Sequence, residues 1–224
     1  MVEISAKYRE VQKKVERAKS ARLGSMPVVL IAVSKTRSAD EIEVLYHLGH
    51  RDFGENYVQE LVEKADELAA RGCKDIRWHF IGHLQRNKVK VLLPHVAVIH
   101  AVDREELAQE ISKRAQELGR AGVPVFIEVN VDEEPSKAGI LPAVLSSEAA
   151  KIARVPGLQP MGIMCIPKAG EGAAGFKKLR KLSYTIRDFV GPDLSMGMSD
   201  DFEAAIAEGA THIRVGTAIF GPRA

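Results

Sequence analysis

Short, nearly continuous apolar runs alternate along this chain with longer segments in which apolar residues recur every three or four positions. Runs of the first kind are typical of buried parallel strands, and segments of the second kind are typical of the helices that cover them. The pattern predicts strands at residues 28–35, 51–54, 76–81, 96–101, 123–131, 158–166, 194–197 and 211–215. It predicts helices between them at residues 38–49, 55–70, 84–93, 104–119, 141–155, 173–190 and 200–208.

Strands that alternate with helices in this way predict an α/β fold, a (β/α)8 TIM barrel, formed by residues 28–221. Residues 1–24 carry apolar positions at helical spacing, so an additional helix is expected before the barrel. Only nine residues follow the last strand, and the N-terminal helix could cover the place of a full eighth helix. No Pro/Gly/Ser-rich stretch divides the chain, so residues 1–224 are expected to form a single domain. A doubly wound open sheet is the alternative arrangement.

The composition limits the classes of partner and compartment. Hydrophobic residues make up 46% of the 224 residues, and the formal net charge of +2 gives no general attraction to nucleic acid or to an anionic membrane. No apolar run approaches the roughly 18 residues of a membrane span, and residues 1–23 are too charged for a signal peptide. Cys73 and Cys165 form no cysteine framework. We therefore expect a cytoplasmic protein, with a monomer or weak dimer as its state.

The first predicted strand ends on Lys35, after an almost entirely apolar run that begins at Val28. Strand alternation puts Ile31, Val33 and Lys35 on one face. If that face is the barrel interior, the amine lies at the mouth of an apolar cavity. There it loses its proton more easily than in water and can form a Schiff base with an aldehyde. The alternative is a solvated lysine just beyond a strand.

The loops after the last two predicted strands suit an anion. In barrels these loops often form a phosphate site from backbone N–H groups. Here they contain Ser199 and Gly216-Thr217, where glycine permits close approach and the hydroxyl groups can donate hydrogen bonds. Two ordinary turns, with Ser199 as a helix N-cap, are the alternative. Asp200 and Asp201 would repel a phosphate unless they point away from it.

Arg214 lies within the last predicted strand. If it points inward, it is a fixed cation near Lys35 and favours the neutral, nucleophilic form of that amine. The alternative is an ion pair with a carboxylate such as Glu128 or Asp201. A Schiff-base lysine, a phosphate cradle and an inward arginine together describe a site for pyridoxal 5′-phosphate, with Arg214 facing the pyridine nitrogen.

Five segments strengthen this interpretation. They are Ala-Val-Ser-Lys-Thr at 32–36, Phe-Gly-Glu-Asn-Tyr-Val-Gln-Glu at 53–60, Trp-His-Phe-Ile-Gly-His-Leu-Gln at 78–85, Ser-Met-Gly-Met-Ser-Asp-Asp at 195–201 and Arg-Val-Gly-Thr-Ala-Ile-Phe-Gly at 214–221. Together they resemble the pyridoxal-phosphate homeostasis protein family, in order and over residues 30–221. The resemblance implies a barrel like the N-terminal domain of alanine racemase. It implies a Schiff base on Lys35, phosphate contacts from Ser199, Gly216 and Thr217, a pyridine-nitrogen contact from Arg214, and Asn56 as a lining residue of the cofactor pocket.

The resemblance also implies a role. Such a protein stores, shields or delivers pyridoxal 5′-phosphate and keeps vitamin B6 and amino-acid pools in balance; it is not expected to be an enzyme. Apo-enzymes that depend on pyridoxal phosphate are the candidate protein partners. Arginine at the pyridine nitrogen disfavours its protonation and weakens the ring as an electron sink, which favours a carrier.

Two alternatives use the same residues. An amino-acid racemase would need Tyr57 or His83 as an acid/base group opposite Lys35. A class I aldolase would use the lysine and the cradle without a cofactor. No metal site is expected, because His79 and His83 fall on a strand and its following loop without a carboxylate or cysteine to complete a set.

Overall fold

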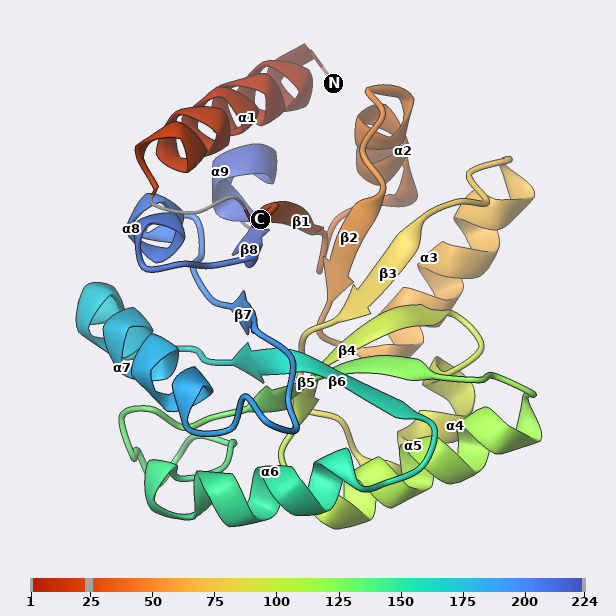
Figure 1. Cartoon of the computed structure of the whole chain (residues 1–224). Helices are drawn as coiled ribbons and strands as arrows, with labels where there is room; N and C mark the ends of the chain where they lie inside the picture. Colours follow the sequence, from red (N-terminus) through yellow and green to blue (C-terminus); the bar gives the residue numbers. More distant parts are fainter. Residues whose placement is uncertain (1, 23–25, 223–224) are drawn as a thin grey trace.

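The computed structural model describes residues 2–22 and 26–222, and in this part of the chain eight parallel strands close into a barrel (Figure 1). Each strand pairs with the next one along the chain, and the last pairs with the first. The expected TIM barrel is therefore confirmed. The strands are β1 (Val29–Val33), β2 (Asp52–Glu55), β3 (Arg77–Phe80), β4 (Val96–Val102), β5 (Val123–Glu128), β6 (Leu158–Met164), β7 (Asp193–Ser195) and β8 (His212–Val215).

Helices follow the strands and cover the outside of the barrel (Figure 1). Their apolar faces are fully buried against the strands, as Leu45, Leu61 and Ile111 illustrate. No helix among the described residues is long and apolar enough to cross a membrane. The helices between strands are α2 (Ala39–His47), α3 (Val58–Ala70), α4 (Val89–Leu92), α5 (Glu105–Glu117), α6 (Leu145–Ala153), α7 (Gly172–Tyr184) and α8 (Phe202–Ala207).

The N-terminal helix covers the place where a full eighth helix would lie. The helix after β8, α9 (Thr217–Phe220), is a single turn, and α1 (Val2–Ala21) packs against both α8 and α9 (Figure 1). Tyr8, Val11 and Val15 of α1 are buried, so its apolar face joins the main core. The expected position of this helix is confirmed. Its expected end at residue 24 lies outside the described residues.

Two predicted helices begin later than expected. Glu55 belongs to β2 and not to a helix, because its buried carboxylate accepts hydrogen bonds from Ser34 and Lys64 and holds the residue in the strand. The segment 84–93 is helical only from Arg86, first as a 3-10 turn (Arg86–Lys88) and then as α4. Residues 81–85 form a loop in which Gly82 lies against the backbone of Asn56.

Other boundaries are also shorter than the apolar pattern predicts. Strand β5 ends at Glu128, since the Asn130 side chain bonds to the backbone of the following turn. Helix α7 ends at Tyr184, where Thr185 bonds its hydroxyl back to a backbone carbonyl and competes with the helix. Helix α8 begins at Phe202 and not at residue 200, because the Asp201 carboxylate accepts the Met198 N–H and holds the preceding turn.

The register of β8 directs two polar residues into the barrel. His212 pairs with Val29 and Arg214 with Ile31 in the neighbouring strand, and both polar residues are buried. A small apolar cluster of Ala101, Phe126 and Met164 forms another part of the interior. The barrel is therefore filled partly by polar groups, which must find hydrogen-bond partners inside it.

Candidate functional site

A cavity of about 220 Å³ opens at the carboxyl ends of the strands. This is the end at which barrels carry their functional residues. The six residues predicted to bind the cofactor all line it, although they come from the loops after β1, β2, β7 and β8 and from β8 itself. These are Lys35, Asn56, Ser199, Arg214, Gly216 and Thr217, accompanied by Val33, Ile81, Ile166, Met198 and Asp200.

Lys35 is half-buried in a turn whose two neighbouring residues are held firmly. Ser34 before it is fully buried and donates its hydroxyl hydrogen to Glu55 Oε1 at 2.7 Å. Thr36 after it has a φ of 64°, in the left-handed region that a β-branched residue rarely adopts, and its N–H donates to Glu60. The position of the Lys35 backbone is therefore fixed before any ligand arrives.

Lys64, on α3, holds this turn in place through hydrogen bonds. Its Nζ donates to Ser34 O at 2.7 Å, Glu55 Oε1 at 2.8 Å and Glu60 Oε1 at 2.7 Å. Only 9% of the Lys64 side chain and none of the Glu55 side chain is exposed. Burial raises the pKa of Glu55, and the charge of Lys64 opposes that rise. The sequence offered one signal for this cluster, the four-residue spacing of Glu60 and Lys64 on a helix.

Backbone amides of the last loop converge on Ser199. Its Oγ accepts the N–H of Gly216 and the N–H of Ala218, each at 3.2 Å. The interpretation of Ser199 as a helix N-cap is thus wrong, since its hydroxyl serves the loop after β8 and not α8. Asp201 turns its carboxylate toward the Met198 N–H at 2.6 Å, within its own loop. Both N–H groups are taken up by Ser199 Oγ, so the Ser199 O–H is left to donate to an anion in the cavity that Ser199 lines.

Arg214 lies beneath this cradle and is only 4% exposed. Its Nη1 donates to Ser195 Oγ at 2.7 Å and its Nη2 to Cys165 O at 2.8 Å. Among the described residues it forms no ion pair with Glu128 or Asp201, so the ion-pair interpretation is wrong. Guanidinium has five N–H groups, and those not engaged by Ser195 and Cys165 remain for a ligand acceptor in the cavity.

Asn56 completes the wall between β2 and β3. Its Oδ1 is buried without a hydrogen-bond partner among the described residues, which marks a place for a ligand donor or a water molecule. A Cβ at Gly82 would lie 2.2 Å from the Asn56 backbone oxygen, so glycine alone fits beside it. The residue-by-residue pattern had not indicated Gly82, because the close approach depends on how two loops meet.

A second cavity of about 230 Å³ adjoins the first and shares Asn56, Ile81 and Ile166 with it. Lys137 lines this cavity and forms an ion pair with Glu134 at 2.7 Å. Glu128 also lines it, with Oε2 buried and unpartnered among the described residues. Burial, with a smaller contribution from Asp103, raises the pKa of Glu128 to about 7.

The Glu128 carboxyl gives the protein a specific pH dependence. Its pKa rises from 4.5 to about 7 on folding, so the unfolded chain releases this proton at lower pH than the folded chain does. The free energy of unfolding therefore falls as the pH rises from 4.5 to about 7, by up to about 3 kcal/mol.

We expect Glu128→Gln to be more stable than the wild type above pH 7, with the difference in unfolding free energy shrinking toward pH 4. Denaturant unfolding across this range measures it, and exposed Glu63→Gln is the control. A pH-independent difference would contradict the assignment.

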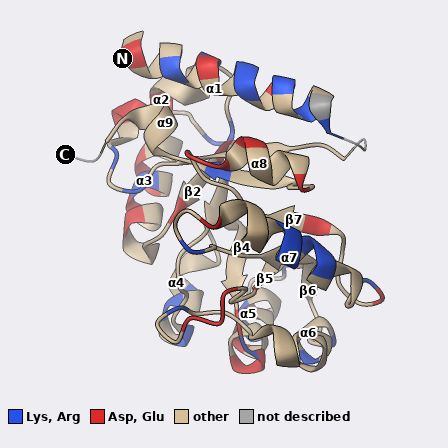
Figure 2. Cartoon of the chain, turned by 90° about the vertical axis from the view of Figure 1, so that its left-hand side faces the viewer, with Lys and Arg blue, Asp and Glu red and all other residues tan. Residues whose placement is uncertain are grey.

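The two histidines considered for a metal do not meet. His79 is buried in the barrel, where it contacts His100 and Asp52, whereas His83 is exposed and lies 3.8 Å from Asp103. Within residues 2–22 and 26–222, no group of three potential metal-ligating side chains is present. Basic side chains are prominent on α7 (Figure 2), where Lys178 pairs with Glu133 and Arg180 with Glu208.

Comparisons with known proteins show which chains this one resembles. Residues 7–224 match the family described as alanine racemase, N-terminal domain. A protein of Pseudomonas aeruginosa named pyridoxal phosphate homeostasis protein is 43% identical over 217 residues, which cover 93% of this chain and 90% of the relative. A protein of the same name from Escherichia coli K12 is 39% identical, with coverage of 100% and 98%.

Solved structures extend the likeness to the fold. PipY of Synechococcus elongatus, with pyridoxal phosphate bound, superposes with a TM-score of 0.82 at 37% identity, covering 93% of this chain and 99% of that chain. Alanine racemase from Corynebacterium glutamicum superposes with a TM-score of 0.70 at 16% identity. That match covers 99% of this chain and 61% of the racemase, and at this identity it concerns the fold alone.

Proposed function

The chain belongs to the family of pyridoxal phosphate homeostasis proteins, and from this premise we propose that it binds pyridoxal 5′-phosphate in the cavity at the carboxyl end of the barrel. The proposal rests on the meeting, in one cavity, of the Lys35 amine, the Ser199 hydroxyl held by two loop amides, and the buried Arg214 cation. The bound group would supply an aldehyde carbon, a pyridine nitrogen and a phosphate. Each has a counterpart in this set.

The residues present fit that group part by part. Lys35 offers the amine for covalent attachment, in a turn fixed by Ser34 and Thr36. The amides of Gly216 and Ala218 hold Ser199 Oγ, and the Ser199 O–H would donate to a phosphate oxygen; these three groups form the proposed phosphate cradle. Thr217 lies between the two amides at the rim.

The remaining groups orient the ring. Arg214 would present an N–H group to the pyridine nitrogen, because its other N–H groups are directed inward. An arginine that remains charged favours a nitrogen that accepts a hydrogen bond and carries no proton. Asn56, with its unpartnered Oδ1, would contact the side of the ring. Ala218 was not among the predicted site residues. It contributes its backbone N–H, which the pattern of side chains in the sequence cannot reveal.

The phosphate cradle gives the first test. We expect the wild type to bind pyridoxal 5′-phosphate much more tightly than pyridoxal, which lacks the phosphate. Ser199→Ala should weaken binding of the phosphate form by about 10–100-fold, the usual cost of losing one hydrogen bond to a charged group, and leave pyridoxal binding unchanged. Absorbance titrations measure both. Ser183→Ala, on α7, is the matched control, since that hydroxyl bonds only to a helix carbonyl. Equal affinity for both compounds in the wild type would contradict the proposal.

We further propose that the protein holds and delivers the cofactor and does not turn over an amino acid. A racemase needs an acid/base group opposite the lysine, and the two candidates for that role are both exposed. The Tyr57 side chain is 63% exposed, and neither Tyr57 nor His83 lines the cavity that contains Lys35. The relatives' names support the same choice. Apo-enzymes in the cytoplasm are the proposed recipients, in keeping with two free, buried cysteines, Cys73 and Cys165.

Incubation with L-alanine separates the carrier from the alternatives. The cofactor-loaded protein should form D-alanine no faster than free pyridoxal phosphate does, measured by chiral chromatography. Rapid formation of D-alanine would establish a racemase. A class I aldolase would keep its activity on a phosphorylated aldehyde in protein stripped of pyridoxal phosphate, an activity that our proposal does not allow.

A further inference from the structure

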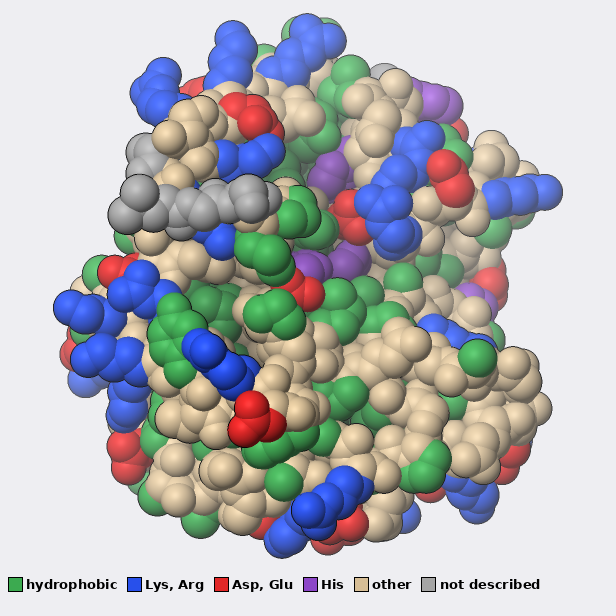
Figure 3. Space-filling view, in the orientation of Figure 1, with side chains coloured by type: hydrophobic (Ala, Val, Ile, Leu, Met, Phe, Trp, Pro, Cys, Tyr) green, Lys and Arg blue, Asp and Glu red, His purple; other side chains and the backbone are tan. Residues whose placement is uncertain are grey.

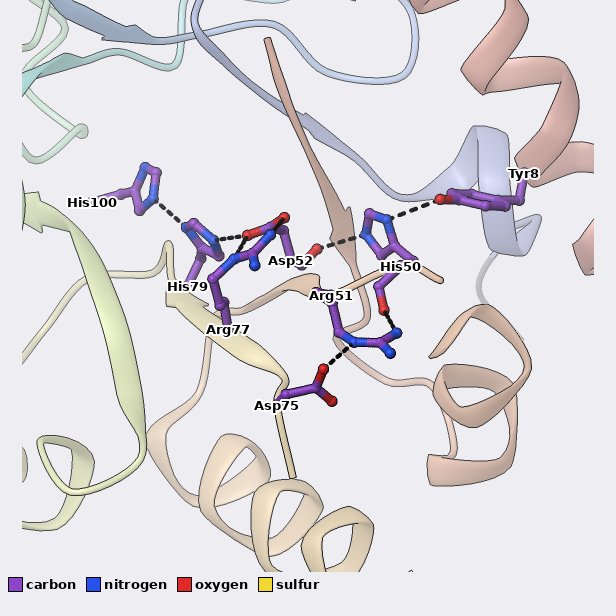
Figure 4. A network of polar contacts seen from close by, with 8 residues as sticks. All are labelled: Tyr8, His50, Arg51, Asp52, Asp75, Arg77, His79 and His100. Atoms are coloured by element: carbon purple, nitrogen blue, oxygen red, sulfur yellow. Dashed lines mark hydrogen bonds and ion pairs between the residues drawn. The ribbon is translucent and has the colours of Figure 1, made fainter. Parts of the chain in front are cut away.

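A continuous row of hydrogen bonds runs from Arg214 across the inside of the barrel. From Arg214 Nη1 the row passes to Ser195 Oγ at 2.7 Å, and Ser195 Oγ lies 2.9 Å from His100 Nδ1. His100 Nε2 lies 3.0 Å from His79 Nδ1, and His79 Nε2 lies 3.1 Å from Asp52 Oδ1. Figure 4 shows the half that includes His100, His79 and Asp52. Five strands contribute one residue each, and none of these contacts follows from sequence proximity.

With both imidazoles neutral, the two ends of the row determine the direction of every bond. Arg214 has only donors, and an ionised Asp52 has only acceptors. His79 must therefore donate from Nε2 to Asp52, and a neutral His79 then accepts at Nδ1 from His100 Nε2–H. A neutral His100 accepts at Nδ1, so the Ser195 hydroxyl donates to it and accepts from Arg214. One assignment of hydrogens satisfies all four contacts, with both imidazoles neutral and protonated at Nε2.

The surroundings support neutral imidazoles. His100 is fully buried and His79 is 2% exposed, so a charged ring would lose nearly all of its hydration. Burial lowers the pKa of His100 well below its ordinary value, and the nearby charge of Arg214 lowers it further. The charged groups that face these rings are Arg214 at one end and Asp52 with Arg77 at the other. The His212 ring lies beside that of His100 but is not part of the row, because its Nδ1 is hydrogen-bonded to the Thr211 hydroxyl.

Asp52 is anchored at the far end (Figure 4). Its carboxylate accepts two hydrogen bonds from Arg77, at 2.7 and 2.5 Å. Burial raises the pKa of Asp52, but the bonds from His79 and Arg77 outweigh that effect and hold its pKa below the ordinary range. The Asp52 backbone carbonyl is held separately by His50 Nε2 at 2.8 Å. In the space-filling view, histidine side chains lie near charged side chains in a hollow of one face (Figure 3).

We propose that Ser195, His100 and His79 are positioning residues that fix Arg214 for the pyridine nitrogen of the cofactor through a one-directional row of hydrogen bonds ending on Asp52. The inference rests on the proposed function for the identity of the ligand, but not for the row itself. A rigid guanidinium presents its remaining N–H groups at a constant place, so less side-chain freedom is lost when the ligand binds. The hydrogen bonds of the row also polarise one another between Arg214 and the Asp52 carboxylate. This stabilises the positive charge of the buried Arg214 without an ion pair in the pocket.

Nitrogen NMR of the protein without cofactor tests the row directly. We expect His79 and His100 to be neutral and protonated at Nε2 at neutral pH. In Ser195→Ala, His100 Nδ1 loses its donor, so its nitrogen shift should change while the rings of His47 and His95, on the outside of the molecule, stay unchanged. A cationic His79, or protonation of either ring at Nδ1, would overturn the proposal. This readout is independent of whether pyridoxal phosphate is the ligand.

A second measurement tests the effect on Arg214. With cofactor labelled at the ring nitrogen, Ser195→Ala should shift the pyridine signal and weaken binding by about tenfold. His212→Gln, at another buried polar residue outside the row, is the matched control and should leave the pyridine signal in place. An unchanged signal in Ser195→Ala would overturn the positioning role. If the labelled cofactor does not bind the wild type, the proposed function fails, and the imidazole measurement still decides on the row.

Discussion

Replacing Lys64 with methionine is expected to cost about 3–5 kcal/mol of unfolding free energy, as is usual when one partner of a buried ion pair is removed. The Glu55 side chain is fully buried, and among the described residues the Ser34 hydroxyl would be its one remaining side-chain donor. The turn that carries Lys35 would also lose its bond from Lys64 Nζ to Ser34 O. Both losses lie directly behind the proposed attachment point, so cofactor binding should fall together with stability.

Denaturant unfolding and a cofactor titration on the same sample measure these effects. Lys74→Met removes an exposed lysine and should change neither quantity. The double variant Lys64→Met with Glu55→Gln should recover part of the stability, because no buried carboxylate is then left unpaired. The Lys64→Met deficit should also grow as the pH rises, since an unpaired buried carboxyl resists ionisation. A loss below about 1 kcal/mol, the range of surface ion pairs, would contradict the role given to this cluster.

Lys35→Ala is expected to abolish retention of pyridoxal phosphate during gel filtration while the protein remains folded. The cradle at Ser199, Gly216 and Ala218 stays intact in this variant, so weak, rapidly exchanging binding should survive. We expect the dissociation constant to rise by about 100-fold or more, equivalent to about 2.7 kcal/mol or more. Lys35 is half-buried, so its loss should leave the unfolding midpoint nearly unchanged.

Equilibrium dialysis gives the affinity, and absorbance of the eluted protein gives the retention. Lys168→Ala is the matched control, because this exposed lysine lies on the loop after β6, at the same end of the barrel. Retention that survives in Lys35→Ala and is lost in another lysine variant would move the attachment point and refute the present assignment.

Periodicity alone predicted the barrel, because alternating apolar runs and amphipathic segments admit few closed arrangements of parallel strands. The six predicted site residues lie together for a related reason: all follow or end strands, and a barrel gathers those positions at one end. The predicted strand through Lys35 is wrong in its extent: β1 ends at Val33, and Lys35 lines the same cavity as Arg214 from the turn that follows.

The supporting residues could not be predicted in this way. Lys64 had the appearance of an ordinary surface lysine on a helix, and its burial depends on the path of the neighbouring turn. Gly82 is required only because another loop passes beside it. The row from Arg214 to Asp52 joins strands that are far apart in the sequence. Such contacts depend on the closure of the barrel, which brings side chains together without any local signal.

We expect the Lys35 amine to hold the cofactor at the rim of the barrel. Reduction of the cofactor-loaded wild type with borohydride, followed by peptide mapping, tests it most directly, because reduction makes the attachment permanent. We predict one pyridoxyl phosphate group per chain, on the peptide that contains Lys35 and absent from the same peptide in Lys35→Ala. Modification concentrated on any other lysine, or no modification at all, would contradict the account.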